Sequence, residues 1–204
     1  MIPTQAAFAA KMLAVAQEFV GIDRAQDLPQ IGRFLGLFGL DAIDGGQFVP
    51  FCAAGVSWSA CKAYAELVGA QYTEATAPAV FQHLLPAVHA LSFVPSASCG
   101  EIWRDAISRG SWVSNAGSDH LDVQAGWLVL YDWPGNGVPD HVEIIINAGD
   151  DLQTVGFNTS GESHGDQVNG GAVALKTRNY DNVLGFVRTW APAAALHSGQ
   201  PGCE

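Results

Sequence analysis

The feature that most constrains the fold of this chain is a change of hydrophobic period near Gly126. Before Gly126, apolar side chains recur mainly at helical spacing, which predicts helices over 5–20, 30–38, 52–68, 79–90 and 98–108. After Gly126, short apolar and alternating runs predict strands over 127–133, 141–147, 152–157, 172–177 and 184–190. Helices followed by strands indicate an α+β domain in which N-terminal helices pack on a C-terminal antiparallel β-sheet.

Length and charge narrow the class of protein further. The 204 residues, 49% hydrophobic, suit one packed core, and we expect a single domain over 1–190. The Ala/Gly/Pro-rich tail, 191–204, is expected to be loosely ordered. The formal net charge is −11, and we find no cluster of Lys and Arg. This argues against nucleic-acid binding and against an anionic membrane surface, because both need concentrated positive charge.

The N-terminal segment does not have the pattern of a targeting sequence. Its Ala-rich stretch is interrupted by Lys11, Gln17 and Glu18 and has no basic region before an unbroken apolar run. No apolar run reaches the roughly 18–20 residues that a membrane helix needs. We therefore expect no signal peptide, no membrane partner and synthesis in the cytoplasm.

The cysteines do not form a recognisable metal or disulfide framework. Their spacing matches no zinc pattern of the C-x-x-C kind, and four cysteines are too few for a disulfide-built scaffold of this length. Most of them are expected to be buried as small hydrophobic residues. The four are Cys52, Cys61, Cys99 and Cys203.

Cys52 differs because of its place in the sequence. It opens the apolar stretch that runs to Val68, with Gly69 as a C-cap, which predicts a central, buried helix. A thiol in the first turn of a helix feels the positive end of the helix dipole, which lowers its pKa and favours the nucleophilic thiolate. The alternative is an inert core cysteine, which most cysteines in apolar helices are.

A cysteine nucleophile needs an imidazole as base and a polar group that orients it. His141 stands at the start of the strand pattern Asp140–Ile146, where a side chain is rigidly held. Asn158 ends the next strand, and two antiparallel strands joined by a turn can bring it beside His141. Asn158 could instead be a simple turn residue before 159–161, and His141 a hydrogen-bonded structural histidine.

Three stretches carry a family resemblance. Residues 50–58, Pro-Phe-Cys-Ala-Ala-Gly-Val-Ser-Trp, are similar to a W-C-A-x-F-V-S-W helix. Residues 125–142, ending Asp-His-Val, are similar to G-D-x-V-x-F-D-W-x-G-D-G-x-x-D-H-V, and residues 154–159, Thr-Val-Gly-Phe-Asn-Thr, to T-I-E-G-N-T. In this order, with a similar closing region at 173–188, the chain resembles the CHAP family of cysteine amidohydrolases and peptidases, relatives of the NlpC/P60 and papain-like enzymes.

The resemblance implies a papain-like fold, with Cys52 as nucleophile and His141 as general base and acid. It also implies cleavage of an amide in peptidoglycan, in the stem peptide, the cross-bridge or the muramoyl–L-alanine bond, with no metal or organic cofactor. The chain departs from the family at Gly156, where many members carry Glu, so the orienting role is expected to fall to Asn158. By analogy with papain-like enzymes, Gln47 is a candidate oxyanion-hole donor.

Several alternatives stay open. The loop 132–140 has the oxygen-rich composition of a calcium loop, but a hairpin turn at Asn136-Gly137 is favoured, and residues 119–122 are expected to form a solvated loop rather than a metal site. Delivery to the cell wall, in the periplasm or outside the cell, fits a phage lysin or an injected antibacterial effector with an immunity protein as partner. The rival functions are an amidase acting on a soluble peptide or polyamine conjugate, and a non-catalytic CHAP-like binding module.

Overall fold

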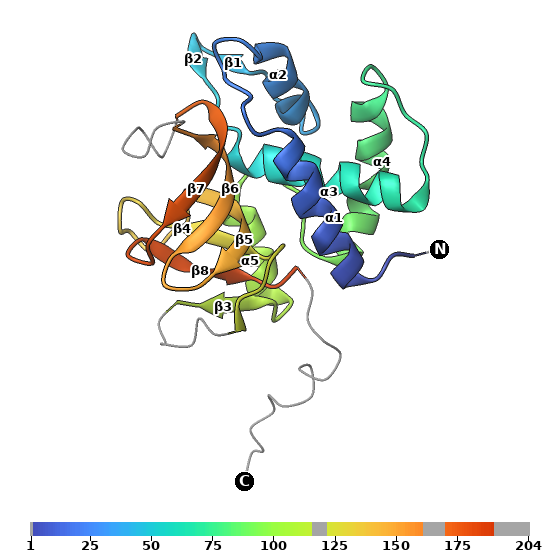
Figure 1. Cartoon of the computed structure of the whole chain (residues 1–204). Coiled ribbons are helices and arrows are strands. Elements are labelled where there is room, and N and C mark those ends of the chain that lie inside the picture. The colour runs from blue at the N-terminus through green and yellow to red at the C-terminus, as the bar shows by residue number, and fades with distance from the viewer. Residues whose placement is uncertain (1, 116–121, 161–169, 190–204) are drawn as a thin grey trace.

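The computed structural model describes residues 2–115, 122–160 and 170–189. The predicted tail over 191–204 lies outside the described residues, as do His120, His164, His197 and Cys203. Within the described part the chain is an α+β structure, in which helices pack against an antiparallel sheet (Figure 1). The fold class predicted from the change of period is therefore confirmed at this level.

Five helices are described, and all five were predicted to within two residues at each end. Their bounds are α1 (Gln5–Glu18), α2 (Leu28–Gly36), α3 (Cys52–Val68), α4 (Ala77–Leu91) and α5 (Cys99–Ser108). Helix α3 ends at Gly69, whose φ of 72° is the left-handed conformation that glycine adopts without strain. Helix α5 begins at the expected cap, where Ser98 Oγ accepts a hydrogen bond from the Glu101 amide at 3.4 Å. No described helix combines the length and apolar character that crossing a bilayer requires.

The larger sheet has six described strands in the order β3-β8-β4-β5-β6-β7, all paired antiparallel. Five of them were predicted: β4 (Leu128–Tyr131), β5 (His141–Ala148), β6 (Leu152–Thr159), β7 (Ala172–Arg178) and β8 (Val183–Val187). The short edge strand β3 (Trp112–Ser114) and the small hairpin of β1 (Ile43–Asp44) and β2 (Gln47–Phe48) were not predicted. These elements are two or three residues long, too short to show a period.

The packing of β5 in the core explains the apolar run in its sequence. Val142 and Ile144 pack in the cluster that joins the sheet to the helices, while Ile145 belongs to a second cluster with Val129 and Phe186. Helix α3 packs on β5 and β6 and is flanked by α1 and α4 (Figure 1). Both faces of β5 are therefore covered, so residues 141–145 are all buried.

Gly55 sets how closely α3 approaches the sheet. A Cβ atom at this position would lie 2.2 Å from Phe157 Cδ1 on β6. We expect Gly55→Ala to destabilise the fold by about 1–3 kcal/mol, because the added methyl overpacks this contact. Gly32→Ala is the matched control: no atom lies within 4 Å of the added Cβ inside α2, and helix propensity predicts a gain of up to about 1 kcal/mol. Thermal unfolding of both variants checks this, and an unchanged Tm for Gly55→Ala would contradict the close contact.

Candidate active site

Cys52 is the first residue of α3 and is 5% exposed. The packing of α3 on β5 brings this end of the helix to His141, the first residue of β5, close enough for each side chain to shift the pKa of the other. His141 is fully buried. The two residues that the sequence predicted as nucleophile and base are thus brought together by a helix start and a strand start.

The imidazole of His141 is held by a residue that was not predicted. His141 Nε2 lies 3.2 Å from Oε1 of Glu143, two residues along the same strand. Residues i and i+2 of a strand point to the same face, so this contact follows from the strand itself. The other ring nitrogen, Nδ1, has no hydrogen-bond partner among the described residues. Nδ1 is therefore the nitrogen that is free to transfer a proton to or from the thiol.

Glu143 is completely buried but well supplied with donors. Arg178 Nη2 donates to Oε1 at 2.6 Å, and Tyr131 Oη and Thr154 Oγ1 donate to Oε2 at 3.2 and 2.5 Å. A buried carboxylate is tolerated when it is paired and hydrogen-bonded in this way. Burial alone would raise the pKa of Glu143, but hydrogen bonds and charge from His141 and Arg178 hold that pKa far below its usual value.

The electrostatics favour a thiolate–imidazolium pair. A hydrogen bond from Cys99 lowers the pKa of Cys52 most strongly. Burial raises it, but the charge of His141 and the amide of Ala53 help to bring it well below the usual value. Burial lowers the pKa of His141, yet Cys52 and Glu143 outweigh burial and raise it to about 9. Both shifts favour the ion pair of a thiolate and an imidazolium. Cys61, farther along α3, is the contrast, because burial raises the pKa of its thiol to about 12.

The predicted hydrogen bond between Asn158 and His141 is not formed. Glu143 pairs with Gly156 across β5 and β6, and continuing this register would place Asn158 opposite His141. However, the register of β6 shifts at a bulge between Phe157 and Thr159, and Asn158 has a φ of 55°, so the strand's alternation is broken. Asn158 Oδ1 instead accepts a hydrogen bond from Arg24 Nη2 at 2.6 Å.

Gly156 provides the room that Glu143 uses. A Cβ atom at Gly156 would lie 2.5 Å from Glu143 Oε1. The resemblance placed a Glu of the family at position 156, and this chain carries its carboxylate on the facing strand instead. The sequence carried a signal for Glu143, because it is a charged residue inside the apolar run of 141–146. A charge buried in a strand must have a partner.

An aromatic pair covers the imidazole. Tyr131 and Trp133 are stacked with ring centroids 4.9 Å apart. Their centroids lie 6.0 and 6.3 Å from that of the His141 ring. The Arg178 guanidinium lies over the Trp133 ring, 5.4 Å from its centroid. Among Cys52, His141 and Glu143, only Cys52 keeps any exposed surface, 5% of the residue.

The remaining predicted site residue is Gln47, the candidate oxyanion-hole donor. Gln47 lies exposed in β2, with no hydrogen bond from its side chain within the described part of the chain.

The loop 132–140 joins the antiparallel pair β4 and β5, as expected for a hairpin. Both carboxylate oxygens of Asp132 accept backbone N–H groups, from Gly135, Asn136 and Gly137 at 2.8, 3.1 and 2.6 Å. Among the described residues, no group of three or more His, Cys, Asp or Glu side chains is arranged to hold a metal ion.

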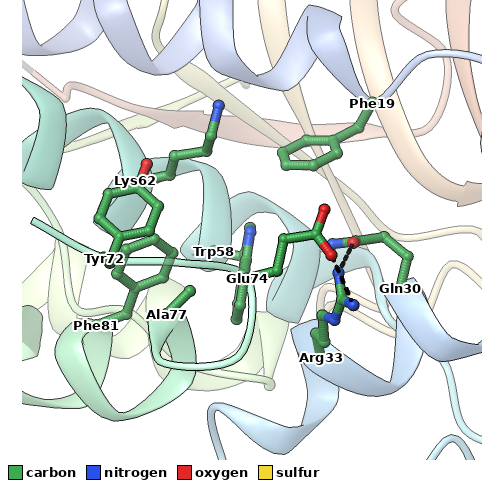
Figure 2. Close-up of a pocket in the computed structure, with 9 residues that line it drawn as sticks. All are labelled: Phe19, Gln30, Arg33, Trp58, Lys62, Tyr72, Glu74, Ala77 and Phe81. Carbon is green, nitrogen blue, oxygen red and sulfur yellow. Dashed lines mark hydrogen bonds and ion pairs between the residues drawn. The ribbon is translucent and has the colours of Figure 1, made fainter.

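A separate pocket lies farther along α3. It has a volume of about 120 Å³ and is lined by aromatic side chains, including Trp58, Tyr72 and Phe81 (Figure 2). Arg33 and Glu74, which also line it, form an ion pair at 3.0 Å. Trp58 follows Cys52 by six residues, which corresponds to about 9 Å along the helix. No residue of the Cys52, His141 and Glu143 group lines this pocket.

Comparison of the chain with family models, curated proteins and solved structures finds no match.

Proposed function

We propose that the protein is a cysteine hydrolase of papain-like architecture that cleaves an amide bond of peptidoglycan. The observation that carries the proposal is the Cys52–His141–Glu143 arrangement: a thiol at a helix start, an imidazole beside it, and a buried carboxylate on the far nitrogen of the imidazole. Such an arrangement supplies a nucleophile, a proton shuttle and an orienting group.

Each group has a step in the proposed reaction. The Cys52 thiolate attacks the amide carbonyl, and the oxyanion is met by backbone N–H groups at the start of α3, including that of Cys52 itself. His141 gives its Nδ1 proton to the leaving amine, which departs and leaves a thioester. His141 then takes a proton from water, which attacks the thioester and releases the acid and the thiolate. Glu143 stays ionised throughout and fixes the orientation of the ring.

The substrate class rests on the resemblance to the CHAP family. Peptidoglycan contains the amide bonds concerned, in its stem peptides, cross-bridges and muramoyl–L-alanine junctions. The net charge of −11 disfavours adhesion to an anionic wall. It therefore favours injected delivery, with an immunity protein as partner, or action on a small substrate, over a wall-adhering lysin. An amidase acting on a soluble peptide or polyamine conjugate uses the same three groups, and is the alternative that the experiment must separate.

The test is to incubate purified peptidoglycan with the wild type and with Cys52→Ala, and to identify released fragments by mass spectrometry. We expect new amine and carboxylate ends from the wild type and none from Cys52→Ala. Cys61→Ala is the matched control, since it changes a buried cysteine of the same helix whose thiol is protonated, and it should keep activity.

Three results would count against the proposal. Intact peptidoglycan with cleavage of soluble peptide amides would shift the substrate to the alternative. Fragments that are also released by Cys52→Ala would remove Cys52 from the mechanism. Wild-type protein that binds peptidoglycan without cleaving any amide would indicate a binding module.

A further inference from the structure

A second cysteine lies against the candidate nucleophile. The sulfur atoms of Cys52 and Cys99 are 3.6 Å apart, although the two residues are 47 positions apart in the sequence. Cys99 is the first residue of α5, as Cys52 is of α3, and both thiols are free. Two helix starts thus point their first side chains at each other, and the hydrolytic mechanism uses only one of them.

The position of Cys99 is fixed by hydrogen bonds to α3. Ser57 Oγ donates to the Ser96 carbonyl, and the Ser96 amide donates back to Ser57 Oγ, each at 2.9 Å. Ser96 Oγ then accepts from the Ser98 amide at 2.9 Å, next to the start of α5. All of these groups are buried or partly buried, so the contact between the two sulfurs is built into the fold rather than resulting from a loose loop.

The two thiols differ in pKa in the way that disulfide chemistry requires. The pKa of Cys52 is lowered, which favours its thiolate, and both residues keep a little exposed surface, 5% for Cys52 and 7% for Cys99. Hydrogen bonding to Cys52 and burial raise the pKa of Cys99 well above its usual value, so Cys99 keeps its proton. A sulfur that favours the thiolate, 3.6 Å from one that keeps its proton, is the arrangement of a peroxide-reactive cysteine and its resolving partner.

We propose that Cys52 and Cys99 form a reversible disulfide under oxidising conditions. The disulfide blocks the nucleophile and so stops hydrolysis. The Cys52 thiolate attacks one oxygen of hydrogen peroxide, the O–O bond breaks, and the departing hydroxide leaves as water once protonated. The resulting Cys52 sulfenic acid is then attacked by the Cys99 sulfur; the S–S bond forms, the S–O bond breaks, and the hydroxyl leaves as water with the proton of Cys99. Two thiols and one peroxide yield one disulfide and two waters.

The movement that this needs is small. A disulfide has an S–S distance of about 2.05 Å, so the sulfurs must approach by about 1.5 Å from 3.6 Å. A dithiol reductant reverses the bond by exchange and restores both thiols. The loss of hydrolysis on oxidation rests on the proposed function, but formation of the bond itself does not.

The test treats the full chain, carrying Cys203→Ser to exclude exchange with that thiol, with one equivalent of hydrogen peroxide, followed by mass spectrometry of the intact protein and of its peptides. We expect a loss of two hydrogen masses, a cross-linked peptide pair containing Cys52 and Cys99, and full reversal by dithiothreitol. Cys61 should remain reduced. Wild-type Cys52 that proceeds directly to the sulfinic acid, or a disulfide to Cys61, would overturn the proposal.

Variants separate this proposal from the proposed function. In Cys99→Ser, oxidation of Cys52 should continue to the sulfinic and sulfonic acids, which dithiothreitol does not reverse. If the wild type hydrolyses no substrate yet forms the reversible Cys52–Cys99 bond, the redox assignment holds and the proposed hydrolysis fails. If the wild type is an active hydrolase whose peroxide inactivation dithiothreitol does not reverse, the redox assignment fails and the hydrolase assignment holds. Circular dichroism of Cys99→Ser and Cys99→Ala checks that either variant is folded.

Discussion

His141→Ala is expected to lower kcat/KM by about 10²–10⁴-fold, which is the usual contribution of a positioned general acid–base group. The variant loses the proton donor for the leaving amine and the charge that stabilises the Cys52 thiolate. Without the imidazolium, the thiol needs a higher pH to ionise. The rate at which iodoacetamide alkylates Cys52, followed against pH, measures this shift without requiring a substrate.

The pH dependence of the wild type follows from the same pair. His141 must be protonated to release the amine, and its pKa is about 9, so kcat/KM should fall as pH rises through about 9. Cys52 must be ionised to attack, and its pKa lies well below the usual value, so the loss of activity on the acid side should come far below the ordinary thiol pKa. Activity is expected to be highest between these two limits, where thiolate and imidazolium coexist.

His89→Ala is the matched control for His141→Ala. His89 lies in α4, 2.8 Å from Asp105, with a side chain that is 43% exposed, and it has no part in the Cys52 group. Its replacement should leave kcat/KM and the alkylation profile unchanged. An equal loss in both variants, or a His141→Ala protein with the alkylation profile of the wild type, would rule out the thiolate–imidazolium pair.

Glu143→Gln is expected to give the second largest effect, a loss of about 10²-fold or more in kcat/KM. The amide keeps the shape of the side chain but removes the charge opposite His141 Nε2. The imidazolium is then less stable, so the alkaline fall in activity should move below about 9, the wild-type value. The variant also leaves the Arg178 guanidinium facing a neutral partner in the core, so Tm should fall.

A second substitution at this position separates charge from folding. Glu143→Asp keeps the charge one methylene farther from His141, and should recover most of the Tm and the alkaline limit while recovering kcat only in part. A merely structural role for Glu143 would lower Tm without moving the pH profile. The position of the alkaline limit is therefore the decisive measurement.

Asn158→Gly is the matched control for the orienting role. Glycine accepts the φ of 55° found at this position, so the backbone conformation is retained while the side chain and its hydrogen bond to Arg24 are removed. The alkaline limit should stay where it is in the wild type. If Asn158→Gly shifts that limit and Glu143→Gln does not, the orienting role belongs to Asn158 after all.

The sequence alone determined the five helices and five of the described strands, in order, because hydrophobic period and caps act over a few residues. The period change at Gly126, the glycine after α3 and the Ser98 cap each report local backbone preferences that the structure reproduces. The same local rules placed Cys52 at a helix start and His141 at a strand start. They therefore identified the two residues that the fold brings together.

Only the tertiary structure decided which side chains complete the site. A single extra residue in β6 and a left-handed backbone at Asn158 turn that side chain away, and the lack of a Cβ at Gly156 gives its space to Glu143. The contact between Cys52 and Cys99 likewise depends on how the Ser96 segment is bound to α3. Such contacts are set by packing between segments far apart in sequence, and local periodicity carries no information about them.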